Sequence, residues 1–234
     1  MSSEPGWLAF FVVCNDMQKG VGVRLEIDEV RRLYGEADSV HDFDHILRVL
    51  TLAERIARAE GADVELVRTA ALLHDWGRAE AVERALDHAQ VAASRARTWL
   101  TARDYPPTQI DAVTHAIAAH RFRTEPAPAT LEAQVLFDAD KLDAIGAIGV
   151  ARAFAYGGAH NQRLWAPISA VDLARWEDEG DDPQRHTPVH EFVVNLARIK
   201  DRLYTQEGRA IAAERHAYMA AFYERMTAEV KGKL

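Results

Sequence analysis

The sequence predicts a single all-α domain. Apolar residues recur at helical spacing from about Val23 almost to the C-terminus, and glycines and prolines interrupt this pattern between separate segments. No segment alternates between apolar and polar residues as a half-buried strand does. The chain has 234 residues, 48% of them hydrophobic, which suits one large domain with its own core. We therefore expect a helical bundle.

The first half of the chain predicts a series of short and medium helices. Gly35 and Gly61 stop the first two, Asp63 is positioned to cap the third, and Pro106 separates the last two. An acidic connection, residues 80–87, interrupts the series. We expect these helices over residues 23–35, 43–60, 63–74, 88–102 and 108–120.

The second half predicts longer helices, over residues 131–156, 189–204 and 209–230. Gly157 and Gly158 end the first of them, and the residues before the next show little periodicity. A loop this long in a compact domain is usually functional or disordered. We assign residues 1–22 to an N-terminal arm and residues 23–234 to the helical domain.

Composition limits the partners and the compartment. The net charge of −8 argues against a general nucleic-acid-binding surface, although a local cluster of Arg and Lys can still bind a phosphorylated small molecule. The hydrophobic run 7–14 is too short to cross a membrane and lacks the flanks of a signal peptide. The single cysteine, Cys14, cannot form an intramolecular disulfide, so we expect a cytoplasmic protein.

Two histidines are predicted to point into one interior. His45 shares a helix face with Val49, Leu52 and Ile56, and His74 ends an apolar run immediately before Asp75. Burying such polar groups without partners costs roughly 2–7 kcal/mol, and a bound metal ion offsets that cost because His nitrogen and Asp oxygen are metal ligands. For the His-Asp pair alone, a capped helix end followed by a glycine is the preferred interpretation, and only the other motifs of the chain favour a metal site.

The predicted helix over residues 131–156 carries three carboxylates among apolar residues. Asp138, Asp140 and Asp143 cannot all face solvent. Asp140 shares a face with Leu136, and Asp138 shares one with Leu142. Periodicity alone leaves open which of these aspartates is buried.

This order of residues resembles the HD-domain superfamily of metal-dependent phosphohydrolases, in a branch of small stand-alone bacterial proteins. The resemblance covers roughly residues 25–230, including a tail over residues 196–229. It implies a single-domain HD-type bundle that holds one divalent ion, Mn, Fe, Co, Ni or Mg. Its motifs are His41-Asp-Phe-Asp-His45-Ile-Leu-Arg48-Val49, Ala70-Ala-Leu-Leu-His74-Asp75 and Asp138-Ala-Asp140-Lys-Leu-Asp-Ala-Ile-Gly-Ala. The metal ligands that it implies are His45, His74, Asp75 and Asp140.

Two of these assignments have rivals. His41 lies four residues before His45 and is the alternative first ligand, although a position at the helix entrance suits it better. Asp138 is the alternative to Asp140, and support of the site from outside the ligand set is again the better interpretation.

The resemblance also implies substrate-binding residues. Arg121 stands where the cyclic-dinucleotide phosphodiesterase branch has a second adjacent histidine, which favours one metal over two. We therefore expect His88 and His120 to contact phosphate or water, and His115 to be structural. Positive side chains near the ligands suit phosphate oxygens, with ion pairs to local carboxylates as the alternative. The substrate-binding candidates are Arg48, Arg78, His88, His120 and Lys141.

The expected activity is hydrolysis of a phosphate ester or phosphoanhydride of a nucleotide or similar small molecule by a metal-activated water, with Asp75 as a catalytic residue. Release of phosphate and release of pyrophosphate stay open. The proton donor to the leaving group is also open, with Glu80 and Glu83 as candidates. The alternatives are a phosphodiesterase of the same superfamily, a non-catalytic metal- or nucleotide-binding regulatory module, and a purely structural metal site.

Overall fold

The structure, a computed structural model, describes residues 25–34, 43–122, 125–168 and 186–234, and none of these residues lies in a β-strand. This confirms the all-α prediction. The expected arm over residues 1–22 and the rival ligand His41 lie outside the described residues. The helices are α1 (Ile27–Tyr34), α2 (Phe43–Glu60), α3 (Val64–Leu73), α4 (Arg78–Glu83), α5 (His88–Thr101), α6 (Pro107–Ala118), α7 (Leu131–Asp143), α8 (Gly146–Ala159), α10 (Pro188–Val194), the 3₁₀ helix η2 (Leu196–Asp201) and α11 (Gln206–Val230).

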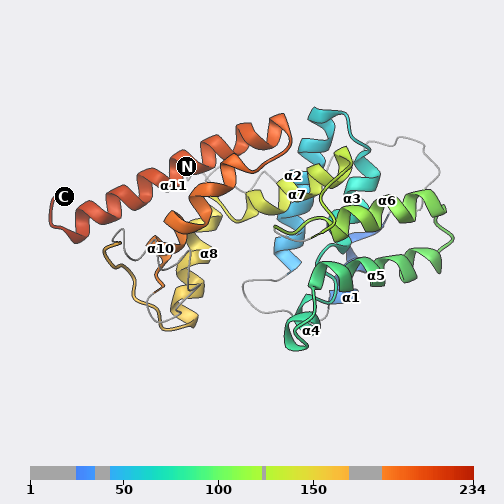
Figure 1. Cartoon of the computed structure of the whole chain (residues 1–234), viewed down its shortest axis with the longest axis horizontal. Helices are drawn as coiled ribbons and strands as arrows, with labels where there is room; N and C mark the ends of the chain where they lie inside the picture. The colour runs from blue at the N-terminus through green and yellow to red at the C-terminus, as the bar shows by residue number, and fades with distance from the viewer. Residues whose placement is uncertain (1–24, 35–42, 123–124, 169–185) are drawn as a thin grey trace, which may run out of the picture.

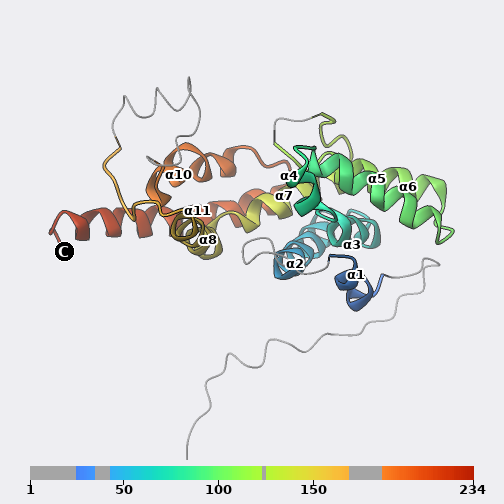
Figure 2. The same cartoon turned by 90° about the horizontal axis from the view of Figure 1, so that it is seen from below.

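The described part of the chain is elongated (Figures 1 and 2). Helices α1 to α6 gather at one end, α8, α10 and α11 gather at the other, and α7 connects the two groups. In the first group α2 packs between α3 and α7, and α3 also packs on α6. Among the described helices, none combines the length and the apolar character that a membrane span requires.

The core forms where the periodicity predicts it. The stripe of α2 is buried as expected, with Val49 and Ile56 fully inaccessible to solvent and His45 only 3% exposed. The side chain of Asp63 accepts hydrogen bonds from the backbone N–H groups of Glu65 and Leu66, both at 3.0 Å, and so caps α3. This cap fixes the start of the helix whose last turn delivers the His-Asp pair.

The predicted continuous helix over residues 131–156 is wrong, because the chain breaks into α7 and α8 at Gly146. This glycine has a φ of 81°, a left-handed conformation that no α-helix contains. The carbonyl of Leu142 in the last turn of α7 accepts a backbone hydrogen bond from the N–H of Ile145 at 3.2 Å and a second hydrogen bond from the side chain of Arg215 in α11. Gly157 and Gly158 do not end a helix but lie inside α8.

Other boundaries also differ from the prediction. The segment 189–204 is a short helix, α10, followed by the 3₁₀ helix η2 rather than one helix. The acidic connection 80–87 contains the short helix α4. Helix α6 ends at Ala118, so His120 projects from the loop beyond it. Helix α11 begins at Gln206, three residues earlier than predicted, because Thr205 caps it.

Candidate metal centre

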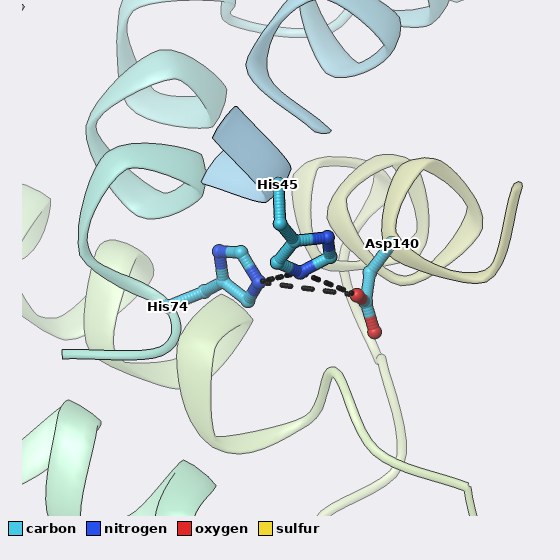
Figure 3. A group of neighbouring side chains, drawn as sticks. All are labelled: His45, His74 and Asp140. Atoms are coloured by element: carbon cyan, nitrogen blue, oxygen red, sulfur yellow. Dashed lines mark hydrogen bonds and ion pairs between the residues drawn. The ribbon is translucent and has the colours of Figure 1, made fainter. Parts of the chain in front are cut away.

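Three helices bring two imidazoles and a carboxylate together (Figure 3). His45 comes from the first turn of α2, His74 from the end of α3 and Asp140 from α7. The Nε2 atoms of the two histidines lie 3.3 Å apart. An Oδ1 atom of Asp140 lies 3.4 Å from Nε2 of His45 and 3.9 Å from Nε2 of His74. Segments nearly 100 residues apart in sequence therefore converge on one point.

Each of these two imidazoles makes a hydrogen bond through its Nδ1 atom, and this bond fixes the orientation of the ring. Nδ1 of His74 donates to the carbonyl of Ala71 at 2.8 Å, and Nδ1 of His45 donates to a carboxylate oxygen of Asp143 at 2.8 Å. A neutral imidazole has one N–H and one lone pair, so these bonds place both lone pairs on the Nε2 atoms. In the metal-free centre the proton of protonated His45 lies between the two Nε2 atoms, which are 3.3 Å apart, and a metal ion would take the place of that proton.

The carboxylate of Asp75 extends this cluster with both of its oxygens. Its Oδ2 atom lies 3.8 Å from Nε2 of His45 and 3.9 Å from Nε2 of His74. Its Oδ1 atom faces the other way, 3.6 Å from Nε2 of His88 and 3.7 Å from Nε2 of His120. This Oδ1 atom is buried and accepts no hydrogen bond from the described residues. A buried carboxylate oxygen without a donor is energetically costly.

These spacings suit a divalent cation better than hydrogen bonds. Ligands that are each about 2.1 Å from a common ion lie roughly 3.0–3.4 Å from one another. The Nε2–Nε2 and Nε2–Oδ1 separations of 3.3 and 3.4 Å agree with this value, and small movements would bring the contacts of 3.8 and 3.9 Å into range. Within the described part of the chain, two groups of ligand atoms are compact enough for an ion: the first is His45, His74 and Asp140, and the second is His74, Asp75 and His120.

The pKa values describe a centre with a strong preference for positive charge. Burial lowers the pKa of His45, but hydrogen bonds to Asp140 and Asp143 outweigh burial and raise that pKa to about 9. Burial raises the pKa values of Asp75 and Asp140, but interactions with neighbouring basic groups, His74 and Arg78 for Asp75 and Lys141 for Asp140, hold both well below the usual range. Two ionised carboxylates therefore face the space between the histidines.

The remaining histidines of the cluster are neutral at physiological pH. Burial lowers the pKa of His88 to about 4, and burial together with the charge of His74 lowers the pKa of His120 to about 3. Burial also lowers the pKa of His74. Nδ1 of His120 donates to the carbonyl of Ile117 at 2.6 Å, so its Nε2 lone pair faces Asp75. Neutral imidazoles are the form that binds metals and accepts hydrogen bonds.

The predicted substrate-binding cations lie at the edge of the cluster, paired with its carboxylates. A guanidinium nitrogen of Arg78 lies 2.9 Å from Asp75, and the ammonium group of Lys141 lies 2.6 Å from Asp140. Arg48 instead pairs with Asp143, at 2.7 Å. All three side chains make the ion pairs that were the alternative interpretation for such residues.

Asp138, the rival of Asp140, faces away from the cluster. It is fully buried, and its carboxylate accepts hydrogen bonds from the backbone N–H of Tyr204 and from both the N–H and the hydroxyl of Thr205. It therefore fastens the start of α11 to α7. His115, which we expected to be structural, accepts a hydrogen bond from the N–H of Ala129.

Of the two candidate proton donors, Glu80 is partly exposed and Glu83 is exposed. Glu80 lies in α4 and pairs with Arg84 and Arg95. The hydrogen bond from Arg84 and the charge of Arg95 lower the pKa of the Glu80 carboxyl. Glu83 is exposed at the end of the same helix.

The sequence did not identify two groups of residues near the centre. Asp143 contacts His45 directly, and Arg152 contacts Asp143; the sequence indicated only that Asp138, Asp140 and Asp143 cannot all face solvent. The second group is Phe122 with Arg202, whose guanidinium carbon lies 5.4 Å from the ring centroid. The ammonium group of Lys141 lies 5.0 Å from the same centroid, so Arg202 belongs to the same edge of the cluster. Asp143 lies within the motif that begins at Asp138, but no pattern in the sequence indicated its contact with His45.

Comparison with known proteins agrees with this geometry. Residues 42–145 match the pattern of the HD domain. An uncharacterized protein of Bacillus subtilis strain 168, YpgQ, is 31% identical over 208 residues, which are 87% of this chain and 91% of YpgQ. The chain belongs to the HD-domain family. Its predicted resemblance to small stand-alone bacterial HD proteins is thereby confirmed.

Solved structures of the HD family share the fold over most of their length. The crystal structure of B. subtilis YpgQ in complex with ADP aligns with a TM-score of 0.65 and 29% identity, covering 88% of this chain and 99% of that one. An HD-superfamily hydrolase from Bacillus thuringiensis aligns with a TM-score of 0.68 and 30% identity, covering 88% and 94%. A shorter match joins this chain to ribonuclease Y of Chloroflexus aurantiacus, 38% identical over 98 residues, 42% of this chain and 17% of that protein.

Proposed function

We propose that this chain is a metal-dependent phosphohydrolase that acts on a nucleotide or a similar small phosphorylated molecule. The observation that carries the proposal is the convergence of two Nε2 atoms and two ionised carboxylates on one space, with a buried Asp75 oxygen that accepts no hydrogen bond from the described residues. We assign the metal ligands to His45, His74, Asp75 and Asp140, within a domain over residues 23–234. A divalent ion in this position would lower the pKa of a water and neutralise charge on phosphate.

The protein side chains would bind and orient the substrate. Arg78 and Lys141 already neutralise the two carboxylates at 2.9 and 2.6 Å, and each has further N–H donors that a phosphate can accept from. Arg202 is exposed on the same edge, beside Phe122, and no carboxylate among the described residues pairs with it. Such a row of cations beside a metal centre suits a phosphate-bearing ligand.

His88 and His120 would contact the substrate or a water on the far side of Asp75. Both rings are neutral at physiological pH, and their Nε2 atoms lie 3.6 and 3.7 Å from its Oδ1 atom. The ADP complex of the related YpgQ supports a nucleotide ligand for this chain as well.

Substrate screening tests this proposal. Purified protein would be incubated with Mn²⁺, Co²⁺, Ni²⁺ or Mg²⁺ and a panel of nucleoside mono-, di- and triphosphates, with separate detection of phosphate and pyrophosphate. We expect turnover of at least one nucleotide that stops on chelation and is lost in Asp75→Asn. Nucleotide binding without any turnover would favour a regulatory module, and unfolding on chelation would favour a structural metal site.

Phosphodiester hydrolysis is the second candidate. The partial match to ribonuclease Y and the group formed by His74, Asp75 and His120 favour it, because that group resembles the start of a second metal position. Against it, Arg121 stands where the cyclic-dinucleotide phosphodiesterase branch has a second adjacent histidine, and it pairs with Asp87 at 3.0 Å. Turnover of cyclic dinucleotides or of a short RNA, without turnover of nucleoside phosphates, would select this candidate.

A further inference from the structure

We propose that Asp143 is a positioning residue that holds the His45 imidazole in the one tautomer and orientation that can bind a metal. The inference rests on the proposed function, because it concerns the same centre. Asp143 is itself no ligand: its carboxylate lies on the opposite side of the His45 ring, hydrogen-bonded to Nδ1 at 2.8 Å. The side chain of Asp143 is only 1% exposed.

The hydrogen bond decides which nitrogen of His45 is available. With the proton on Nδ1 and shared with Asp143, the Nε2 lone pair faces His74 and Asp140 at 3.3 and 3.4 Å. The other tautomer would carry its proton on Nε2, in the space that a cation needs. A carboxylate acceptor behind a ligand histidine also increases the basicity of the ring and restrains its rotation.

Two arginines hold the Asp143 carboxylate in place. Arg48, one turn after His45 in α2, donates from Nε to Oδ1 at 2.7 Å and from Nη2 to Oδ2 at 3.1 Å. Arg152 of α8 donates from Nη1 to Oδ2 at 3.1 Å and to the backbone carbonyl of Asp143 at 3.3 Å. The carboxylate is thus an ion-paired hydrogen-bond acceptor with little freedom to turn away from His45. Arg152 reaches it because α8 departs from α7 at the break.

Contacts run from Arg152 of α8 to Asp143 and from Asp143 to the candidate metal ligand His45, and Arg48 also binds Asp143. Arg48 and Asp143 belong to α2 and α7, and Arg152 belongs to α8. We infer that Arg48 acts on the metal centre through Asp143, in addition to any contact with substrate. Removing Arg152 should leave the bond between Asp143 and His45 intact and should weaken metal binding less than removing Asp143.

The test measures metal affinity rather than turnover. Metal-free wild type, Asp143→Ala, Asp143→Asn and Arg152→Met would be titrated with Mn²⁺ by calorimetry. We expect Asp143→Ala to weaken Mn²⁺ binding by about 10- to 100-fold, the usual effect of removing the partner of a ligand histidine. Asp143→Asn should lose less, because its amide oxygen can still accept the Nδ1 hydrogen. Asp111→Ala, at an exposed ion pair with Arg97, is the control that should bind like wild type.

NMR of the histidine ring nitrogens gives a second measurement. Its result would not change if Asp143 only stabilised the fold. In the Zn²⁺-loaded wild type, His45 should show a slowly exchanging Nδ1 proton, and Asp143→Ala should lose this signal while His74 keeps its own. Equal Mn²⁺ affinity in folded Asp143→Ala and wild type would overturn the inference. The inference would also be overturned if Asp143→Ala and Asp143→Asn lost the same amount of Mn²⁺ affinity and the same amount of thermal stability. Absence of Mn²⁺ binding by wild type itself would instead remove the proposed function.

Discussion

The Nε2 atoms of His45 and His74 lie 3.3 Å apart, and each ring is hydrogen-bonded through its Nδ1 atom to a different acceptor. These hydrogen bonds lie on the far side of each ring and so keep the two Nε2 atoms directed toward each other. Because both acceptors are buried, rotation of either ring would break a hydrogen bond that water cannot easily replace. The positions of both Nε2 atoms are therefore fixed before any ion binds.

Removal of a ligand should abolish metal binding without unfolding the domain. We expect His45→Ala to weaken Mn²⁺ binding by more than about 100-fold, beyond the effect of losing a residue behind a ligand. Helical content by circular dichroism should stay near that of wild type. His160→Ala is the matched control, since His160 is exposed just after α8, where its ring stacks on Tyr156 and hydrogen-bonds to the Tyr156 carbonyl. Tight Mn²⁺ binding in His45→Ala would contradict the ligand assignment.

Metal binding should become tighter as pH rises. The pKa of His45 is about 9 in the metal-free centre, so below pH 9 this ring is mostly protonated, and an ion must displace its proton. Affinity should therefore increase from pH 6 to pH 9 and then level off. Calorimetry in buffers of different ionisation enthalpy should detect about one proton released per ion at pH 7. A release of zero protons at pH 7 would contradict this assignment.

One metal ion per chain is expected. His120→Ala should still bind one equivalent of Mn²⁺, because the four assigned ligands remain, while its KM for a substrate should rise. Metal analysis of dialysed wild type and variant would measure the stoichiometry. Two equivalents in wild type and one in His120→Ala would show that the group of His74, Asp75 and His120 holds a second ion.

The contact of Asp138 with the start of α11 should contribute strongly to stability. Asp138→Ala leaves the buried N–H groups of Tyr204 and Thr205 without their acceptor, and we expect a loss of about 3 kcal/mol in the free energy of unfolding. Urea denaturation measures this loss. Asp201→Ala, at an exposed pair with Lys200, should stay within about 0.5 kcal/mol of wild type. A comparably small loss in Asp138→Ala would contradict the role assigned to this contact.

The glycine at the break between α7 and α8 should resist substitution. Gly146→Ala would place a Cβ atom at a φ of 81° and only 2.9 Å from the Arg215 side chain, so we expect it to lower stability by more than about 1 kcal/mol. Gly158→Ala, in α8 with nothing within 4 Å of its Cβ, should be neutral or stabilising by up to about 1 kcal/mol. Thermal unfolding of both variants compares them directly. A Gly146→Ala variant as stable as Gly158→Ala would contradict the strain argument.

Helical periodicity predicted the core and the inward position of His45, because those features depend on neighbours in one helix. The three aspartates of α7 show where this reasoning ends. Asp138 and Asp143 are both fully or almost fully buried, but one binds backbone N–H groups and the other binds His45. Their partners come from segments far away in sequence, so no pattern within α7 distinguishes them.

The break at Gly146 escaped prediction for a related reason. An isolated glycine within an apolar helical pattern is tolerated at a modest cost, so the pattern alone favours continuity. The guanidinium group of Arg215, which donates to the carbonyl of Leu142, comes from a helix more than sixty residues later. The path of the chain at this point is therefore decided by a tertiary contact.

The short connection after Asp143 makes the register of α8 matter to the metal centre. An α-helix turns by about 100° for each residue, so one residue inserted just after Gly146 would rotate Arg152 to another side of α8. Its guanidinium group would then no longer point back at the carboxylate behind His45. An insertion or deletion in this connection should therefore loosen the orientation of the His45 imidazole, although it does not contact that ring.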